Sequence, residues 1–185
     1  MKQTTLILIL LLTVVTVKSQ SVFRWGLVGG INASKVVSDT KTKSLNGYHG
    51  GLIAEIKTPT DWGFEVDALM SSKGTRIEGL NSNLETALLD YKLNYLDFPV
   101  LVKKYFLSVI NVQAGPQFSY LLSANYDGND VKSNLHSFDL AAVVGLGIDV
   151  KVAKASIRYN YGLTEIGKGD GHNSVLQITL GIWVN

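Results

Sequence analysis

The residue types most often used in catalysis and metal binding are few in this chain and far apart. Cysteine is absent, and the three histidines are His49, His136 and His172. Metal sites and nucleophilic triads need such side chains at recognisable spacings, and this sequence has none of those spacings. Asp170-Gly171-His172 is the only suggestive cluster, and a glycine-rich turn explains it more simply. We therefore expect no enzyme activity and no catalytic, cofactor-binding or metal-binding residues.

Two other patterns resemble ligand-binding motifs but lack the context that those motifs require. Asp127-Gly128-Asn129-Asp130 is similar to part of a calcium loop, without the remainder of that motif, so we interpret it as a turn. Gly29-Gly30, Gly50-Gly51 and Gly145-Leu146-Gly147 do not open a helix after a strand, as a phosphate-binding loop must. We expect these glycines to permit tight bending and close packing in a curved sheet.

Apolar and polar residues alternate along much of the chain, as the run Trp62–Met70 shows. Its even positions are apolar or small, whereas Glu65 and Asp67 fall on the other face. Because successive side chains of a strand point to opposite faces, this run predicts a strand with one apolar and one charged face. Beyond residue 19, no apolar stretch reaches the roughly 18 residues of a membrane-spanning helix.

Eight stretches follow this pattern and predict an all-β fold. Their approximate bounds are 23–33, 48–57, 62–70, 89–103, 110–122, 137–149, 156–163 and 176–182. The links between them alternate between short (57–61, 104–107, 151–154) and long (34–47, 72–88, 123–134, 165–174). All short links therefore share one end, as in outer-membrane barrels with short periplasmic turns. We predict an eight-stranded antiparallel up-and-down transmembrane β-barrel.

Residues 1–19 have the pattern of a secretory signal peptide. Lys2 precedes an apolar run from Leu6 to Val17, and small residues flank a cleavage point before Gln20. The expected domains are thus the signal peptide, 1–19, and an outer-membrane barrel, 20–185. Loss of Lys2 and Lys18 lowers Lys plus Arg from 17 to 15, equal to the 15 acids. The neutral mature chain gives no indication of nucleic-acid binding.

The stretch 89–103 contains a change of phase. Leu93 and Tyr95 are assigned to the apolar face before it, and Leu96 and Phe98 after it, which predicts a β-bulge at Tyr95-Leu96. A hairpin centred on Tyr105-Phe106 would place Tyr95 opposite Pro116, so that the proline's missing donor meets the interrupted ladder.

Aromatic residues predict two interfacial girdles, because their rings are apolar with a polar tip. The girdle at the short-link end would comprise Trp25, Trp62 and Trp183, and the girdle at the long-link end Tyr48, Tyr91, Tyr120 and Tyr161.

The polar faces should line the interior, which in an eight-stranded barrel is filled by side chains. Acids and bases are mixed there, so we expect a plug of ion pairs and hydrogen bonds. A hairpin centred on Val152-Ala153 would set Asp149 across from Ser156 and diagonal to Arg158. The expected inward residues are Arg24, His49, Glu55, Lys57, Glu65, Asp67, Asp90, Lys92, Asn94, Asp97, Asn111, Gln113, Gln117, Asp139, Asp149, Arg158, Asn160 and Gln177.

The segments Leu93–Lys103, Gln113–Leu122 and Arg158–Thr164 resemble the outer-membrane β-barrel family common in Bacteroidetes, which includes the PorT-like and "porin family" proteins. The resemblance covers essentially the whole mature chain. It implies an eight-stranded barrel in the outer membrane, without implying a known activity.

The expected function is a structural or interaction role through the external loops. The expected partners are outer-membrane lipid and other envelope proteins, with the barrel itself a monomer. The main alternative, suggested by the PorT-like resemblance, is a component of a secretion or surface-assembly apparatus. Two further alternatives are a narrow channel, which predicts conductance steps in planar bilayers, and a soluble lipocalin-like barrel with its apolar face around a ligand.

Carbonate extraction distinguishes the membrane barrel from the lipocalin-like one. We expect the protein to stay in the membrane pellet, because its apolar faces would point outward to lipid. Release into the soluble fraction would refute the membrane assignment.

Overall fold

The computed structural model describes residues 22–37, 42–80, 86–126, 129–132, 135–164 and 172–184. The predicted signal peptide lies outside these ranges. Within them, no helix is long and apolar enough to cross a membrane. The strands are β1 (Val22–Val37), β2 (Thr42–Lys57), β3 (Trp62–Leu80), β4 (Thr86–Phe106), β5 (Ile110–Tyr126), β6 (Asn129–Asp130), β7 (Phe138–Asp149), β8 (Ala153–Gly162) and β9 (His172–Trp183).

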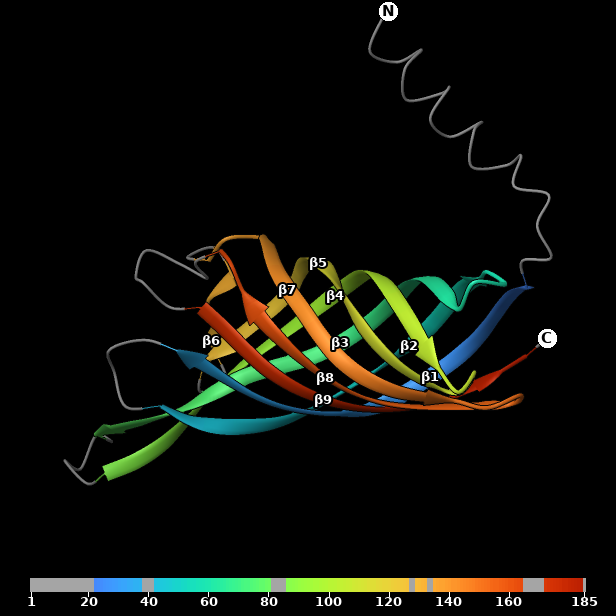
Figure 1. The fold of residues 1–185 in the computed structure, drawn as a ribbon. Helices are drawn as coiled ribbons and strands as arrows, with labels where there is room; N and C mark the ends of the chain where they lie inside the picture. Colours follow the sequence, from blue (N-terminus) through green and yellow to red (C-terminus); the bar gives the residue numbers. More distant parts are fainter. Residues whose placement is uncertain are drawn as a thin grey trace, which may run out of the picture.

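The eight long strands form a closed antiparallel barrel, confirming the predicted fold (Figure 1). Neighbours in the sheet are neighbours in sequence, and pairing of β1 with β9 and of β4 with β5 completes the ring. The two-residue β6 pairs only with the end of β5. The β2–β3, β4–β5 and β7–β8 turns all lie at one end of the barrel, where β1 starts and β9 finishes.

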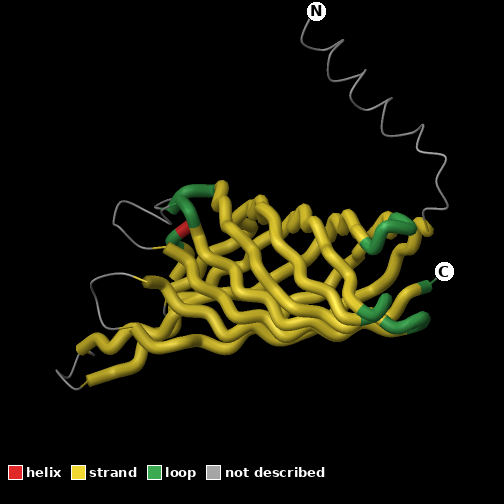
Figure 2. The backbone as a smooth tube through the Cα atoms, in the orientation of Figure 1, coloured by secondary structure: helices red, strands yellow, loops and turns green. Residues whose placement is uncertain are grey.

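The strands extend further toward the long-link end than the sequence pattern predicted (Figure 2). The predicted link 72–88 is largely ladder, because β3 and β4 stay paired as far as Leu80 and Thr86. Backbone hydrogen bonds to a neighbouring strand satisfy these segments even where the side chains no longer alternate in polarity. Alternation of apolar and polar residues therefore identifies only those strand segments that have one apolar face.

Side chains point as predicted on most strands. Along β7, Val144, Leu146 and Ile148 are more than half exposed on the outer surface, whereas Asp139 and Asp149 are nearly inaccessible. The same alternation runs through β5, β8 and β9. An outer surface made of Leu, Ile, Val and Phe around a charged interior is the reverse of a soluble protein and suits surrounding lipid.

The upper half of β4 differs from the prediction. Leu93 and Tyr95 are almost fully buried inside the barrel, while Lys92 is on the outer surface and Asn94 is half-buried. The alternation of β4 is therefore uninterrupted. The bulge is in β5: Tyr95 pairs with Leu121 and Asn94 with Ser123, leaving Leu122 as the extra residue.

The reversal has a packing cause. Leu93 and Tyr95 form an internal apolar cluster with Leu121 and Ala124, against which Val131 and Leu135 also pack. Above the bulge, the barrel wall thus has apolar residues inside and polar residues outside. This part of the wall has the polarity of a soluble sheet.

The prolines lie where the ladders are interrupted, though not in the predicted pairing. Pro116 pairs with Ala142 rather than facing Tyr95. Between β4 and β5 the pairs run from Pro99↔Gln117 to Val102↔Ala114, without pairs between them. At that point a Cβ on Gly115 would lie 2.0 Å from the carbonyl oxygen of Val100, so the close approach of β5 to β4 requires glycine.

One of the predicted girdle residues is internal. Trp25 and Trp62 are more than 40% exposed at the short-turn end, but Trp183 is only 6% exposed. Its ring packs with Val28, Ile53 and Leu69. The last residue of β9 therefore points its indole into the barrel, where it covers the interior at the short-turn end. The side chain of Tyr91, assigned to the other girdle, lies outside the described residues.

The outward apolar surface generates a prediction. Val144→Lys places a charge on the lipid-facing side of β7 and should destabilise the folded barrel in vesicles by about 2–4 kcal/mol if the position lies near the bilayer midplane. Urea titration followed by heat-modifiable gel mobility measures this. Leu107→Lys, in the exposed β4–β5 turn, is the matched control and should change stability by less than about 0.5 kcal/mol. Equal stability of the two variants would contradict a lipid-facing β7.

Candidate functional site

The interior near the short-turn end holds four acids and four bases in one connected cluster, hereafter the charge cluster. Six of the eight long strands contribute to it, so residues distant in sequence meet on the barrel axis. Its charges cancel formally. The members are Arg24, Glu55, Glu65, Asp67, Lys103, Asp149, Lys154 and Arg158.

Lys103 and Glu65 form the centre of the charge cluster, and both side chains are fully buried. The Lys103 ammonium donates to Glu65 at 2.6 Å, to Glu55 at 2.9 Å and to Asp149 at 3.1 Å. Glu65 also accepts from Lys154 at 2.6 Å and from Arg158. The Lys103 ammonium thus donates to three carboxylates, and the Glu65 carboxylate accepts from three cationic side chains. These bonds use nearly all of the hydrogen-bonding capacity of both groups, which buried ions require to remain charged.

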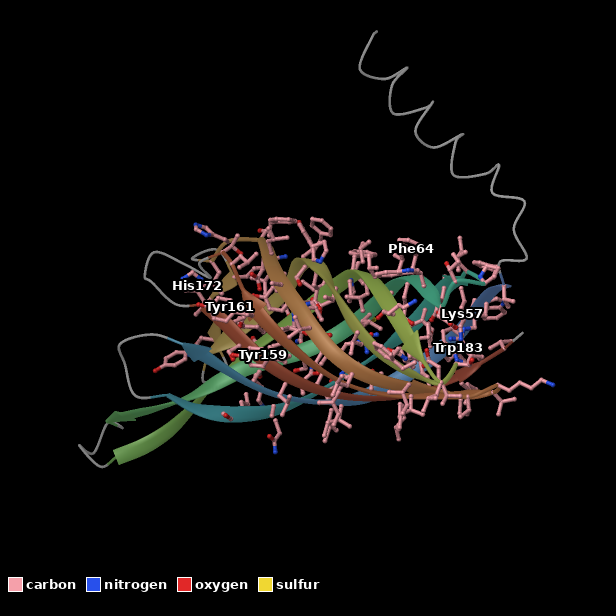
Figure 3. All side chains as sticks on the ribbon, in the orientation of Figure 1. Lys57, Phe64, Tyr159, Tyr161, His172 and Trp183 are labelled. Atoms are coloured by element: carbon pink, nitrogen blue, oxygen red, sulfur yellow. The ribbon has the colours of Figure 1, made fainter. Side chains whose placement is uncertain are left out.

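Arg24 and Tyr105 close the cluster toward the short-turn end. The Arg24 guanidinium donates to Asp149 at 3.0 Å and to the Tyr105 hydroxyl at 2.8 Å, and lies 3.9 Å above the Trp183 ring. The Tyr105 hydroxyl lies 2.6 Å from Glu55 and also contacts Asp149, so it can donate its proton to either carboxylate. Figure 3 shows Trp183 and Lys57 together at this end.

Inward-facing glycines provide the space for these side chains. A Cβ on Gly63 would lie 2.9 Å from a Glu55 oxygen, and a Cβ on Gly145 would lie 3.0 Å from Cγ of Arg158. The predicted glycine role in close packing is confirmed here. The charge cluster has enough room because Gly63 of β3 and Gly145 of β7 place no side chain in the space that it occupies.

A neutral hydrogen-bonded layer occupies the middle of the barrel. His49 lies in it, with Nδ1 2.7 Å from Asn32 Oδ1 and Nε2 2.9 Å from Thr179 Oγ1. Asn160 donates to Gln117 at 3.1 Å and to Gln177 at 2.9 Å. His49 faces inward as predicted, and its two ring nitrogens are held by neutral side chains.

The external third of the interior contains one ion pair beneath the apolar cluster. Lys73 donates to Asp97 at 2.9 Å, and its ammonium lies 4.7 Å from the Tyr95 ring centroid. Val131 N donates to the Ala124 carbonyl at 3.0 Å, which holds the β5–β7 connection over the cluster. Through the described residues, the interior is therefore occupied at all three levels.

The other histidines do not join His49. His136 is exposed just before β7. His172 begins β9, and its Nδ1 is 3.2 Å from the Thr164 carbonyl; Figure 3 places it near Tyr161, at the long-link end. Asp170 and Gly171 lie outside the described residues, as do Asp127 and Gly128. Among the residues that the structure describes, no group of three or more His, Asp or Glu could hold a metal ion.

Most of the predicted inward residues face the interior, and three do not or cannot be assigned. Lys92 and Asn94 are on the outer side of β4, and the side chain of Asp90 lies outside the described residues. Asp149 faces Lys154 rather than Ser156, because the β7–β8 hairpin is centred on Lys151-Val152, one residue earlier than predicted. Arg158 consequently pairs across the barrel with Glu65 and Asp67, not with Asp149.

Four interior residues were missed, three of them because the predicted strands were too short. Lys103 was placed within a strand but not on its inward face, Tyr105 and Lys154 were placed in short links, and Lys73 in a long one. Each continues the inward alternation of its strand. The charge imbalance of the predicted inward set would have indicated the three lysines, because that set contained seven acids and only four Lys or Arg.

Comparisons with known proteins agree with this architecture. A family model described as "Outer membrane protein beta-barrel domain" matches residues 18–167. A search of curated proteins found no match.

Two solved structures are similar in fold. Ail, the attachment invasion locus protein of Yersinia pestis, solved with the heparin analogue sucrose octasulfate, has a TM-score of 0.53 and 17% identity over 87% of this chain and 98% of its own. Neisserial surface protein A has a TM-score of 0.56 and 14% identity over 85% and 96%.

The charge cluster makes a testable prediction about stability. Glu65→Gln preserves the shape of the side chain but leaves Lys103, Lys154 and Arg158 with an uncompensated buried charge, and should cost about 3–5 kcal/mol. Urea unfolding in vesicles measures the change. Asp61→Asn, in the tight β2–β3 turn, is the matched control and should be nearly neutral.

A second variant separates charge balance from the loss of one hydrogen bond. Glu65→Gln combined with Lys103→Met restores neutrality and should recover part of the lost stability. If the double variant is as unstable as the sum of the two single variants, the cluster is not held by charge balance.

Proposed function

We propose, from the premise that this chain belongs to the outer membrane protein beta-barrel domain family and lies in the outer membrane, that it acts as an interaction protein through its external end. The barrel anchors and orients that end. It neither conducts solute nor catalyses a reaction.

The filled interior is the observation that carries this proposal. Lys103, Glu65 and Arg158 are each at most 1% exposed and bonded across the axis. A conducting barrel needs a continuous wet lumen, as the much wider porins have. Opening one here would require separating several buried ion pairs, each costly to break.

The reversed wall supports an external surface built for contact with water and partners. On β2, β4 and β5, the outer positions above the bulge include Asn46, Lys92 and Asn125, all exposed. Their inward neighbours Leu93 and Ala124 are fully buried. A wall with this polarity is stable outside lipid, so β2–β5 carry folded structure beyond the membrane.

Charge argues against a polyanion as the partner. The similar barrel Ail has been solved in complex with a heparin analogue. Here the segments 34–47, 72–88, 123–134 and 165–174 contain seven Lys or Arg and seven Asp or Glu. Lys73, one of the seven bases, is buried in an ion pair with Asp97. The remaining six bases and seven acids leave no basic excess for a polyanion, which favours a protein surface instead.

A second candidate is a component of a secretion or surface-assembly apparatus, as the PorT-like resemblance implies. The extended β3–β4 ladder favours it, because Thr86–Asp90 pair with β3, and among the described residues the β4–β5 pairs begin only at Tyr91↔Tyr126. An edge strand of this kind can accept a strand from another protein. Export would use the expected signal peptide, 1–19.

Site-specific photo-cross-linking in cells tests the proposal. A cross-linker at Asn125, on the external wall, should capture one or a few defined envelope proteins, whereas the same group at Lys151, in the β7–β8 turn, should capture none of them. Defined partners of a secretion machine would select the second candidate. Cross-links from Lys151 alone, or none from either position, would contradict an external interaction role.

A further inference from the structure

The outer wall has a pocket where its polarity reverses. The pocket measures about 330 Å³ and lies across β2–β5. Three of its lining side chains, Tyr48, Met70 and Leu122, are 71%, 64% and 39% exposed, so it opens to the outside. Its other lining residues are Ser71, Ser72, Asn94, Tyr95 and Ser123.

Two irregularities in the sheet create this pocket. The β2–β3 ladder is broken between Ser44↔Thr75 and His49↔Ser71. Asn32 seals the break from inside by donating to the carbonyls of Tyr48 at 3.3 Å and Ser72 at 3.0 Å. The β5 bulge interrupts the ladder on the other side of the pocket. The pocket therefore results from the backbone geometry of the sheet.

Chemical groups follow one another along the outer wall in a fixed order. The apolar Phe98 lies below the pocket, and the apolar Met70 lines it. At the level of the pocket Asn94 donates to Ser123 Oγ at 2.9 Å, and two residues further along β4 is the exposed Lys92. Two residues of strand span roughly 7 Å. Acyl chains, a neutral hydrogen-bonding headgroup and an anion have the same order in an anionic lipid.

We propose that this pocket binds an acylated, phosphorylated sugar of the outer leaflet. Its acyl chains would lie along Met70 and Leu122, its hydroxyl or amide groups would hydrogen-bond to Ser72, Asn94 and Ser123, and its phosphate would contact Lys92. None of the described residues lining the pocket is a carboxylate, so nothing in it repels an anion.

A sugar fits better than the headgroup of a simple phospholipid. Asn94 and Ser123 offer neutral donors and acceptors before the cation is reached, which match the hydroxyls of a sugar ring. Tyr48, 71% exposed, presents an aromatic face of the kind that packs against such a ring. The long-link end faces the outer leaflet, because short turns are periplasmic in this class of barrel.

Native mass spectrometry of the full-length protein in detergent, with added diphosphoryl lipid A, tests the proposal. Lys92→Ala should reduce the bound fraction about tenfold, the loss expected for one charge-assisted hydrogen bond. Asn94→Leu should also reduce it. Lys151→Ala, an exposed lysine of the β7–β8 turn, is the matched control and should bind as the wild type does.

A measurement on the wild type makes the result independent of variant folding. Dephosphorylated lipid A should bind about tenfold more weakly than the diphosphoryl form. Phosphatidylglycerol in equal amount should fail to displace lipid A. Equal loss in Lys92→Ala and Lys151→Ala, equal binding of both lipid A forms, or displacement by phosphatidylglycerol would each overturn the assignment.

Discussion

Confinement of charge inside a closed ring of strands is the constraint on which the rest of this structure depends. Because the outer surface faces lipid, ionised residues can only point inward, where water is scarce and an unpaired charge is costly. The chain meets this constraint with four acids and four bases in contact on the barrel axis. Lys103 and Glu65, each bonded three ways, connect the two halves of the cluster.

Other features follow from that packing. Gly63 and Gly145 leave the volume that Glu55 and Arg158 occupy, so two strands give up inward side chains to accommodate ions. Trp183 turns inward and covers Arg24 instead of joining the interfacial aromatics. The apolar cluster at the other end closes the interior without charge. A barrel filled in this way is an anchor, and contacts with partners are left to its external end.

The alternation of apolar and polar residues predicted the strand segments whose outer face contacts lipid. It failed where the outer face is polar. The lower half of β4 and the predicted stretches of β5, β8 and β9 were assigned to the correct faces, since apolar meant outward there, whereas Trp183 at the end of β9 was not. Leu93 and Tyr95 were assigned to the wrong face because apolar means inward above the bulge. Asp149 was paired wrongly because moving the centre of a hairpin by one residue changes every cross-strand partner. No local pattern could show that Arg158 reaches Asp67 across the barrel.

The span of the ion pairs along the chain has a consequence for how the barrel is made. Arg24 and Asp149 are 125 positions apart, and Arg158 and Glu65 are 93 apart. None of these partners meets until the first and last strands have come together. In a partly inserted chain, unpaired charged side chains would contact the hydrocarbon of the bilayer, so assembly intermediates are unstable. Insertion is therefore expected to be concerted, with a slow step at ring closure.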